Sequence, residues 1–203
     1  MKRETFLFTG LAALGAVLFW AMSPTLAQDA TNVETRMADP ENMLTIQLES
    51  GDVIIQMLPD VAPRHVERIR TLAEEGAYDG VVFHRVIEGF MAQTGDVEHG
   101  RGDGDLRRAG TGGSQYPDLP AEFSNVPFDR GAVGMARAQN PNSANSQFFI
   151  MFQPAPHLNG QYTVWGQVVS GMEHVDAIRR GNGPNGSVSD PDQMITVRVG
   201  APE

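Results

Sequence analysis

Short apolar runs dominate this chain, and glycine-rich turns separate most of them. Runs of five to eight residues bounded by turn signals are typical of β-strands rather than of helices. We predict strands at Val81–Val86, Phe90–Thr94, Ala132–Ala136, Gln147–Phe152, Tyr162–Val169 and Met194–Val199. Upstream, MLTIQLESGDVIIQML alternates in two segments around Ser50, Gly51 and Asp52, which indicates a β-hairpin. The chain is therefore predicted to be mainly β.

Two segments have the period of a helix instead. The first follows Asp60, a candidate cap, has Pro63 in its first turn and ends at Gly76. The second extends from Gly171 to Arg180. Because helices do not alternate with the strands, the pattern disfavours a parallel βαβ sheet. We expect a closed antiparallel barrel capped by two α-helices.

The first 27 residues have the pattern of a secretory signal peptide. Lys2 and Arg3 precede an apolar run, and Thr25 and Ala27 suit the −3 and −1 positions of a cleavage after Ala27. An uncleaved membrane anchor at residues 6–22 is the alternative, although a span usually needs about 20 apolar residues. We expect cleavage and export.

Residues 28–41 show no period and are predicted to be a flexible linker before a single domain at residues 42–200. Without Lys2, Arg3 and Glu4, the 15 basic and 25 acidic residues of the chain become 13 and 24, a net charge of −11. This acidity disfavours nucleic acid and anionic membranes as partners. The chain has no cysteine, which excludes disulfides and thiolate metal sites. A periplasmic location is expected.

Several motifs that bind phosphate or metal are present only in part. GNGPNG at Gly181–Gly186 has the spacing G-x-G-x-x-G, but it follows a helix and has Pro184 where a phosphate-binding helix should begin. We interpret it as a loop. GTGGS at Gly110–Ser114 lacks the lysine of a phosphate loop, and the five histidines show no metal-ligand spacing. No cofactor or metal is expected.

Three separated segments share the pattern of a known family. They are FHRVIEGFMAQTGD at residues 83–96, NSQFFIMF at residues 145–152 and HLNGQYTVWGQV at residues 157–168. In this order, with GTGG between the first two, they resemble the cyclophilin-type peptidyl-prolyl cis-trans isomerases, and bacterial, exported members in particular. The resemblance covers about Leu44 to Val199. It implies an eight-stranded antiparallel barrel closed by two helices, and an enzyme that accelerates rotation about X-Pro bonds.

The resemblance also implies roles for residues in the matching motifs. Arg85 is implied to be the catalytic arginine, and Gln93 to orient it and contact the substrate. The implied proline pocket consists of Phe90, Met91, Phe149 and Leu158. The other implied substrate-binding positions are Gly110, Ala136, Arg137, Ala138, Gln147, His157 and Tyr162.

The chain departs from the best-known eukaryotic pattern at three of these positions. His157 stands where a tryptophan is usual, Tyr162 where a histidine is usual, and Arg137 where an asparagine is common. The resemblance implies that the tryptophan donates a hydrogen bond to cyclosporin, so we expect weak cyclosporin binding here. Proline-containing polypeptides are the expected partners, and the protein is expected to be a monomer.

An arginine suits this chemistry because rotation about a peptide bond breaks no covalent bond and needs no nucleophile. The guanidinium is always charged and has a rigid planar fork of donors that can be aimed at one atom. Two other functions stay open on the sequence. One is a non-catalytic module or holdase that grips proline-containing segments in the same groove. The other is a barrel that binds a small apolar ligand, which the bulky strand residues disfavour.

Overall fold

The computed structural model describes residues 40–200. The predicted signal peptide at residues 1–27, and all of the predicted linker at residues 28–41 except its last two residues, lie outside the described residues and stay predictions. In the described part, no helix is long and apolar enough to cross a membrane.

Eight strands and two α-helices form the described domain. The strands are β1 Met43–Leu48, β2 Gly51–Met57, β3 Arg85–Ile87, β4 Met91–Thr94, β5 Ala132–Met135, β6 Phe148–Met151, β7 Val164–Ser170 and β8 Thr196–Val199. The helices are α2 Pro63–Glu74 and α3 Met172–Ala177. Single turns of 3₁₀-helix are η1 Pro40–Asn42, η2 Leu106–Arg108 and η3 Pro156–Leu158. Every predicted strand segment therefore overlaps an observed strand, although β3 shares only Arg85 and Val86 with the predicted segment Val81–Val86, and the mainly β class is confirmed.

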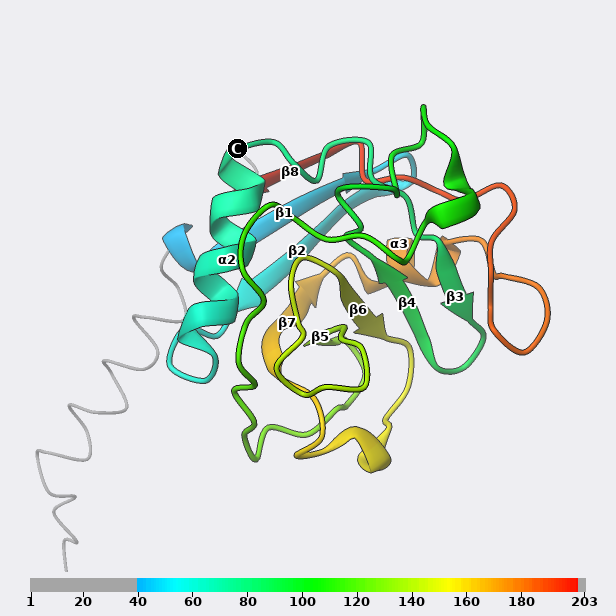
Figure 1. The fold of residues 1–203 in the computed structure, drawn as a ribbon. Coiled ribbons are helices and arrows are strands. Elements are labelled where there is room, and N and C mark those ends of the chain that lie inside the picture. Colours follow the sequence, from blue (N-terminus) through cyan, green and yellow to red (C-terminus); the bar gives the residue numbers. More distant parts are fainter. Residues whose placement is uncertain (1–39, 201–203) are drawn as a thin grey trace, which may run out of the picture. The chain divides into compact units, whose positions relative to one another are not determined.

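The eight strands form one antiparallel sheet in the order β3-β4-β6-β5-β7-β2-β1-β8. The sheet curls into a half-barrel, and Figure 1 shows α2 along one side of it. Register shifts in the β2–β7 and β5–β7 pairs mark bulges, which bend and twist a sheet locally. Among the described strands, no ladder joins the end strands β3 and β8. The closed barrel that we expected is therefore not shown, whereas the eight antiparallel strands are.

Two apolar clusters fill the interior. The larger one lies around Trp165, whose ring meets Phe148 edge to face at 5.4 Å, while Phe148 meets Tyr78 at 5.7 Å in the same geometry. The smaller one contains Phe128 and Phe149, stacked at 5.7 Å, and lies under the candidate site. Burial of such aromatic side chains stabilises a fold strongly, so the candidate site rests on a rigid floor.

Helix α2 begins later than predicted, and Asp60 is not its cap. Its N-cap residue is Ala62, which provides no capping side chain. The carboxylate of Glu122 replaces it by accepting the main-chain N–H groups of Arg64 at 3.2 Å and His65 at 3.1 Å. Glu122 also contacts His65 Nδ1 at 2.6 Å. A cap from 57 residues away in the sequence satisfies the free N–H groups of the first turn but leaves no local signal.

Helix α3 is shorter than the predicted segment at residues 171–180. It ends at Ala177 because Ile178 has a ψ of 132°, which is extended rather than helical. Val175 and Ile178 are both buried, and the helix lies within the predicted segment, so its place is correct while its length is not. Because the helix ends here, the following residues 181–186 can run alongside β3.

Candidate active site

The register of the sheet brings three of the implied site residues into one row. Arg85 of β3 lies opposite Gln93 of β4, and Gln93 lies opposite Phe149 of β6. Side chains at directly opposed positions share one face of an antiparallel sheet and lie close together. The hairpin between β3 and β4 therefore places a cation and an amide beside an aromatic ring.

A chain of hydrogen bonds starts at the Arg85 guanidinium. Its Nη1 donates to Gln93 Oε1 at 3.0 Å, Gln93 Nε2 donates to Gln147 Oε1 at 3.0 Å, and Gln147 Nε2 donates to the carbonyl of Gly112 at 2.8 Å. At the other edge, Arg85 Nε donates to the carbonyl of Asn185 at 2.9 Å. We call these four bonds the relay. A guanidinium can only donate hydrogen bonds. The side-chain amides of Gln93 and Gln147 must therefore both be oriented with their oxygen towards Arg85 and their nitrogen away from it.

The relay leaves donor capacity at the site. A guanidinium carries five N–H hydrogens, and the relay uses one on Nε and one on Nη1. Within the described residues, Nη2 of Arg85 donates no hydrogen bond. Arg85 is only partly buried, so these hydrogens remain accessible to a ligand.

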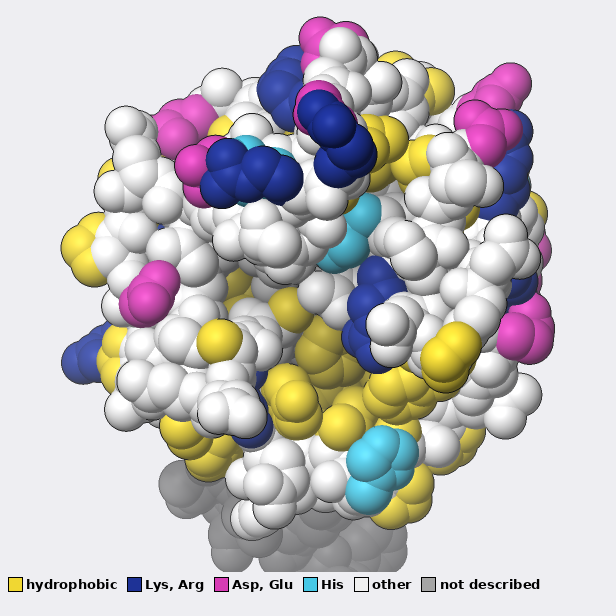
Figure 2. Space-filling model, turned by 45° about the vertical axis from the view of Figure 1, so that its right-hand side comes forward, with side chains coloured by type: hydrophobic (Ala, Val, Ile, Leu, Met, Phe, Trp, Pro, Cys, Tyr) yellow, Lys and Arg dark blue, Asp and Glu magenta, His cyan; other side chains and the backbone are white. Residues whose placement is uncertain are grey.

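A cavity of about 180 Å³ opens beside the guanidinium. It is lined by Arg85, Phe90, Met91, Gln93, Ala136, Arg137, Phe149, Leu158 and Tyr162. We call it the apolar pocket. Figure 2 shows this face hollowed over a floor of hydrophobic side chains, with a basic side chain at the edge of the hollow. The size suits one small ring rather than a large ligand.

A second cavity of about 310 Å³ adjoins the apolar pocket and shares Gln93, Ala136 and Arg137 with it. Its other lining residues are Gly110, Thr111, Gly112, Ala138, Ser143, Asn145, Ser146 and Gln147. We call it the polar pocket. The two pockets together contain every implied site residue except His157, which stacks on Phe90 with ring centres 5.8 Å apart. A larger hollow of about 400 Å³, between the β1–β2 turn and α3, contains none of them.

The Arg137 side chain ties the walls of the two pockets together, a role that the sequence did not indicate. Its Nη1 donates to the carbonyl of Ala138 at 2.8 Å and its Nη2 to that of Gln161 at 2.9 Å. The guanidinium also lies 4.3 Å from the centre of the Tyr162 ring, within cation–π range. Tyr162 in turn meets Phe149 edge to face at 5.9 Å.

Asp96 is a second residue whose role sequence reasoning missed. It is fully buried, and its Oδ2 accepts the main-chain N–H groups of Gly110 at 2.7 Å and Gly112 at 2.9 Å. Its Oδ1 accepts those of Glu98 at 3.1 Å and His99 at 2.8 Å. The carboxylate thus pins both ends of the 96–112 loop. The aspartate at the end of the segment at residues 83–96 was the available signal.

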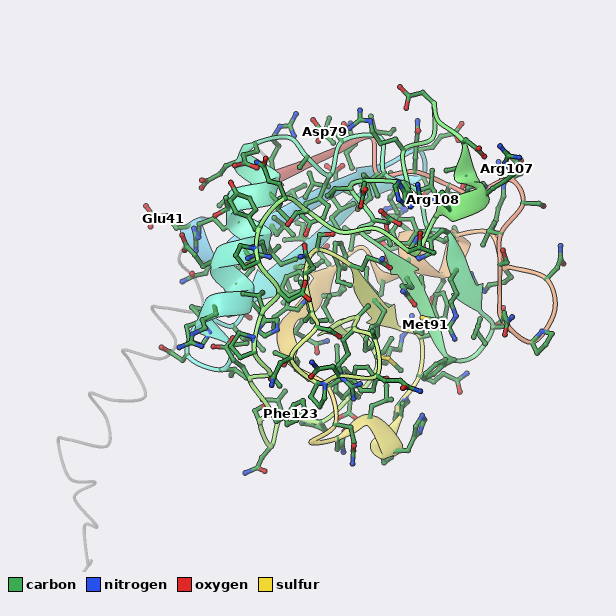
Figure 3. All side chains as sticks on the ribbon, in the orientation of Figure 1. Glu41, Asp79, Met91, Arg107, Arg108 and Phe123 are labelled. Carbon is green, nitrogen blue, oxygen red and sulfur yellow. The ribbon has the colours of Figure 1, made fainter. Side chains whose placement is uncertain are left out.

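The outer part of this loop lies away from the groove. Figure 3 shows Arg107 on η2 at the periphery of the molecule, where it pairs with Asp105. Met91, on β4, lies nearer the middle of the view and lines the apolar pocket. The loop therefore contributes its pinned base, not its charged tip, to the site.

His84 lies under the pinned loop, beside Arg85 in the chain. A side chain on Gly110 would come within 3.0 Å of the His84 ring, so the two pack directly. Both ring nitrogens are buried without a hydrogen-bond partner in the described residues. Burial lowers the pKa of the His84 imidazole below its ordinary value, and the Asp96 carboxylate opposes this only in part. The neutral ring is the form that fits.

Comparisons with known proteins identify the family of this chain. Residues 43–199 match the family described as cyclophilin type peptidyl-prolyl cis-trans isomerase/CLD. A probable peptidyl-prolyl cis-trans isomerase from Brucella suis is 58% identical over 193 residues, which are 94% of this chain and 96% of that protein. Peptidyl-prolyl cis-trans isomerase B from Bacillus subtilis is 41% identical over 75% of this chain and 94% of its own. The chain belongs to the cyclophilin-type peptidyl-prolyl cis-trans isomerases.

Solved structures show the same fold. A cyclophilin from Cryptosporidium parvum, crystallised in the presence of the dipeptide Ala-Pro, superimposes with a TM-score of 0.69 at 25% identity, over 79% of this chain and 99% of that chain. A cyclophilin from Hirschia baltica gives a TM-score of 0.67 at 26% identity, over 79% and 74% of the two chains. The predicted family and class of enzyme are thereby confirmed.

We predict that the free energy of unfolding decreases as the pH falls below about 6.5. The folded-state pKa of His84 is lowered, and so is that of His65, mainly by burial. The unfolded chain then binds more protons than the folded protein in the window below the ordinary histidine pKa. Each group contributes a slope of up to about 1.4 kcal/mol per pH unit there. Urea unfolding at a series of pH values between 7.5 and 5 measures it.

His84→Gln isolates the contribution of the histidine at the site. The variant should show a shallower pH slope than the unmodified protein, while retaining the share that His65 contributes. His65→Gln is the matched substitution, because that histidine is also buried but lies at α2. Identical slopes for the unmodified protein and His84→Gln would mean that His84 takes up its proton equally well in the folded state.

Proposed function

We propose that this chain accelerates rotation about X-Pro peptide bonds, with Arg85 acting on the proline nitrogen. The observation that carries the proposal is the relay, which holds the guanidinium at the edge of the apolar pocket without any substrate. The solved relative that was crystallised with Ala-Pro supports a proline-containing ligand for this groove. Nothing in the reaction requires a nucleophile or a general acid.

Catalysis follows from the change of charge at the nitrogen. The barrier to rotation of about 18–20 kcal/mol arises from C–N conjugation, and uncatalysed X-Pro exchange takes tens to hundreds of seconds. In the twisted transition state conjugation is lost, and the lone pair localises on the nitrogen. A donor aimed at that nitrogen therefore stabilises the transition state more than the planar ground state. The free hydrogens of Arg85 are the donors in this scheme.

The apolar pocket has the complementary task of holding the pyrrolidine ring while the preceding carbonyl swings. Phe90, Met91, Phe149 and Leu158 offer the ring a surface without competing hydrogen bonds. A dry surface also strengthens the contact between guanidinium and nitrogen, because the local dielectric is low. Gln93 orients Arg85 and can contact the substrate from the shared wall of the two pockets. The polar pocket then accepts peptide that flanks the proline.

A non-catalytic binding module is the alternative from a different class. It would use the same groove to grip proline-containing segments, and the polar pocket alone could do so. The relay favours the enzyme, because a pure binder has no need of an arginine fixed at two of its nitrogens.

Arg85→Ala should reduce kcat/KM by a factor of about 10²–10³ while the protein stays folded. Loss of one preorganised donor typically costs about 2.7–4 kcal/mol of transition-state stabilisation. A protease-coupled assay on a short proline peptide measures the rate. Arg64→Ala is the matched control, since it removes an exposed arginine from α2.

Two results would decide against the proposal. A folded Arg85→Ala protein with an unchanged rate would remove Arg85 from the mechanism. An unmodified protein that binds proline peptides but does not isomerise them would establish the binding module instead.

We further propose that the protein acts in the periplasm on exported polypeptides, as a monomer. The N-terminal pattern at residues 1–27 supports export, and the acidic charge disfavours membranes and nucleic acid as partners. Mass analysis of the native protein should find a chain that begins at Gln28. A full-length, membrane-bound species would instead assign residues 6–22 to an anchor.

The protein should be only weakly inhibited by cyclosporin, and His157→Trp should increase inhibition more than it changes turnover. His157 stacks on Phe90 at the rim, whereas the proline pocket is lined by other side chains. Histidine buries less apolar area than tryptophan, at about 25 cal/mol per Å² lost. A poorly paired carbonyl of the drug would cost about 1–3 kcal/mol more.

Titration of both proteins with cyclosporin, followed by the isomerase rate, tests this. His157→Phe is a useful control, because it restores apolar area without an N–H donor. Tight inhibition of the unmodified protein would show that the rest of the groove compensates for the histidine.

A further inference from the structure

The segment GNGPNG at Gly181–Gly186, interpreted from the sequence as a loop, lies directly against β3. The N–H of Val86 donates to the carbonyl of Gly186 at 2.7 Å, and the N–H of Gly181 donates to the carbonyl of Val86 at 2.9 Å. Figure 1 shows this part of the chain, in orange, looping out beside β3. The loop is thus fastened to the strand that carries Arg85.

The fastened loop presents one acceptor to the site. The main-chain carbonyl of Asn185 accepts Arg85 Nε at 2.9 Å. At its other edge, the guanidinium donates a second hydrogen bond, from Nη1 to Gln93 Oε1. A single hydrogen bond would let the planar group swing about the bond, but two bonds at different nitrogens fix its direction. The loop therefore supplies half of the support of Arg85.

The position of this carbonyl depends on the absence of a side chain at Gly186. A Cβ there would collide with the Ile87 side chain and come within 2.8 Å of the carbonyl oxygen of Val86. Gly186 also has a φ of +66°, which disfavours other residues. Gly183 has a similar φ of +71°, yet a Cβ there would have nothing within 4 Å. A side chain would therefore meet a similarly unfavourable φ at both positions, but only at the buried Gly186 would it also collide with β3.

We propose that the 181–186 loop is a positioning element for catalysis, acting through the Asn185 carbonyl on the Arg85 guanidinium. The inference rests on the proposed function of Arg85. Asn185 touches no reacting atom in this scheme. Displacing its carbonyl turns the guanidinium away from the proline nitrogen, and the loss is felt where the donor matters, in the transition state. The apolar side chains of the pocket are unchanged, so binding of the planar substrate is retained.

Gly186→Ala should therefore lower kcat by between about tenfold and a hundredfold, with KM within about twofold of the unmodified value. Gly183→Ala is the matched control and should leave kcat within about twofold, because it adds the same strain without the collision. Circular dichroism establishes that each variant is folded.

The decisive readout is coupling to Arg85. Arg85→Lys keeps the charge but has no Nε–H to donate to Asn185. In that background, Gly186→Ala should change kcat by no more than about twofold. A purely structural role of the loop would lower kcat equally in both backgrounds, and that result would overturn the proposal. Equal effects of Gly186→Ala and Gly183→Ala in the unmodified protein would overturn it as well.

If Gly186→Ala does not fold, deletion of Gly183 and Pro184 replaces it. Both residues are exposed. Their removal shortens the loop, which we expect to displace Asn185 from Arg85, and it adds no side chain against β3. The same loss of kcat is expected, and an unchanged kcat would contradict the proposal. Failure of the proposed function would give a different result. The unmodified protein would then not isomerise proline peptides, or Arg85→Ala would be as active as the unmodified protein.

Discussion

The guanidinium of Arg85 is held by hydrogen bonds that leave from two of its nitrogens and lead to main-chain carbonyls of two distant loops. One leads directly to Asn185, and the other passes through Gln93 and Gln147 to Gly112. Main-chain carbonyls within an ordered fold cannot swing away as exposed side chains can. In the function proposed for Arg85, a donor fixed in this way costs no reorganisation when charge develops on the substrate, which is what makes electrostatic catalysis effective.

The rest of the domain supports these two anchor points. The buried Asp96 carboxylate holds the Gly112 end by accepting four main-chain N–H groups of its loop. Hydrogen bonds to Val86 of β3 hold the Asn185 end. Between them, the β3–β4–β6 register sets the spacing of Arg85 and the amide beside it. The curled sheet thus fixes the positions of the residues that form the relay, and the apolar pocket lies beside the relay.

Features that arise from local pattern could be predicted from the sequence, and features that depend on distant partners could not. Alternating apolar residues and glycine turns indicated the strands, and the family motifs indicated Arg85 and its pocket. The prediction that Asp60 caps α2 was wrong, because the capping carboxylate comes from Glu122, which is distant in the sequence. The contact between Arg85 and the Asn185 carbonyl could not be predicted, because every residue has a main-chain carbonyl and the residue type therefore gives no indication of it. Closure of the barrel was not shown, since strand count alone does not determine whether the end strands pair.

The most direct test of a preorganised guanidinium is ¹⁵N NMR relaxation of the Arg85 Nε–H bond in the free protein and in the complex with a proline peptide. We predict an order parameter close to about 0.85 in the free protein, as for rigid backbone, with little change on binding. Arg85→Lys identifies the signal by its loss. An order parameter below about 0.6 in the free protein that rises only when peptide binds would contradict a site organised before the substrate arrives.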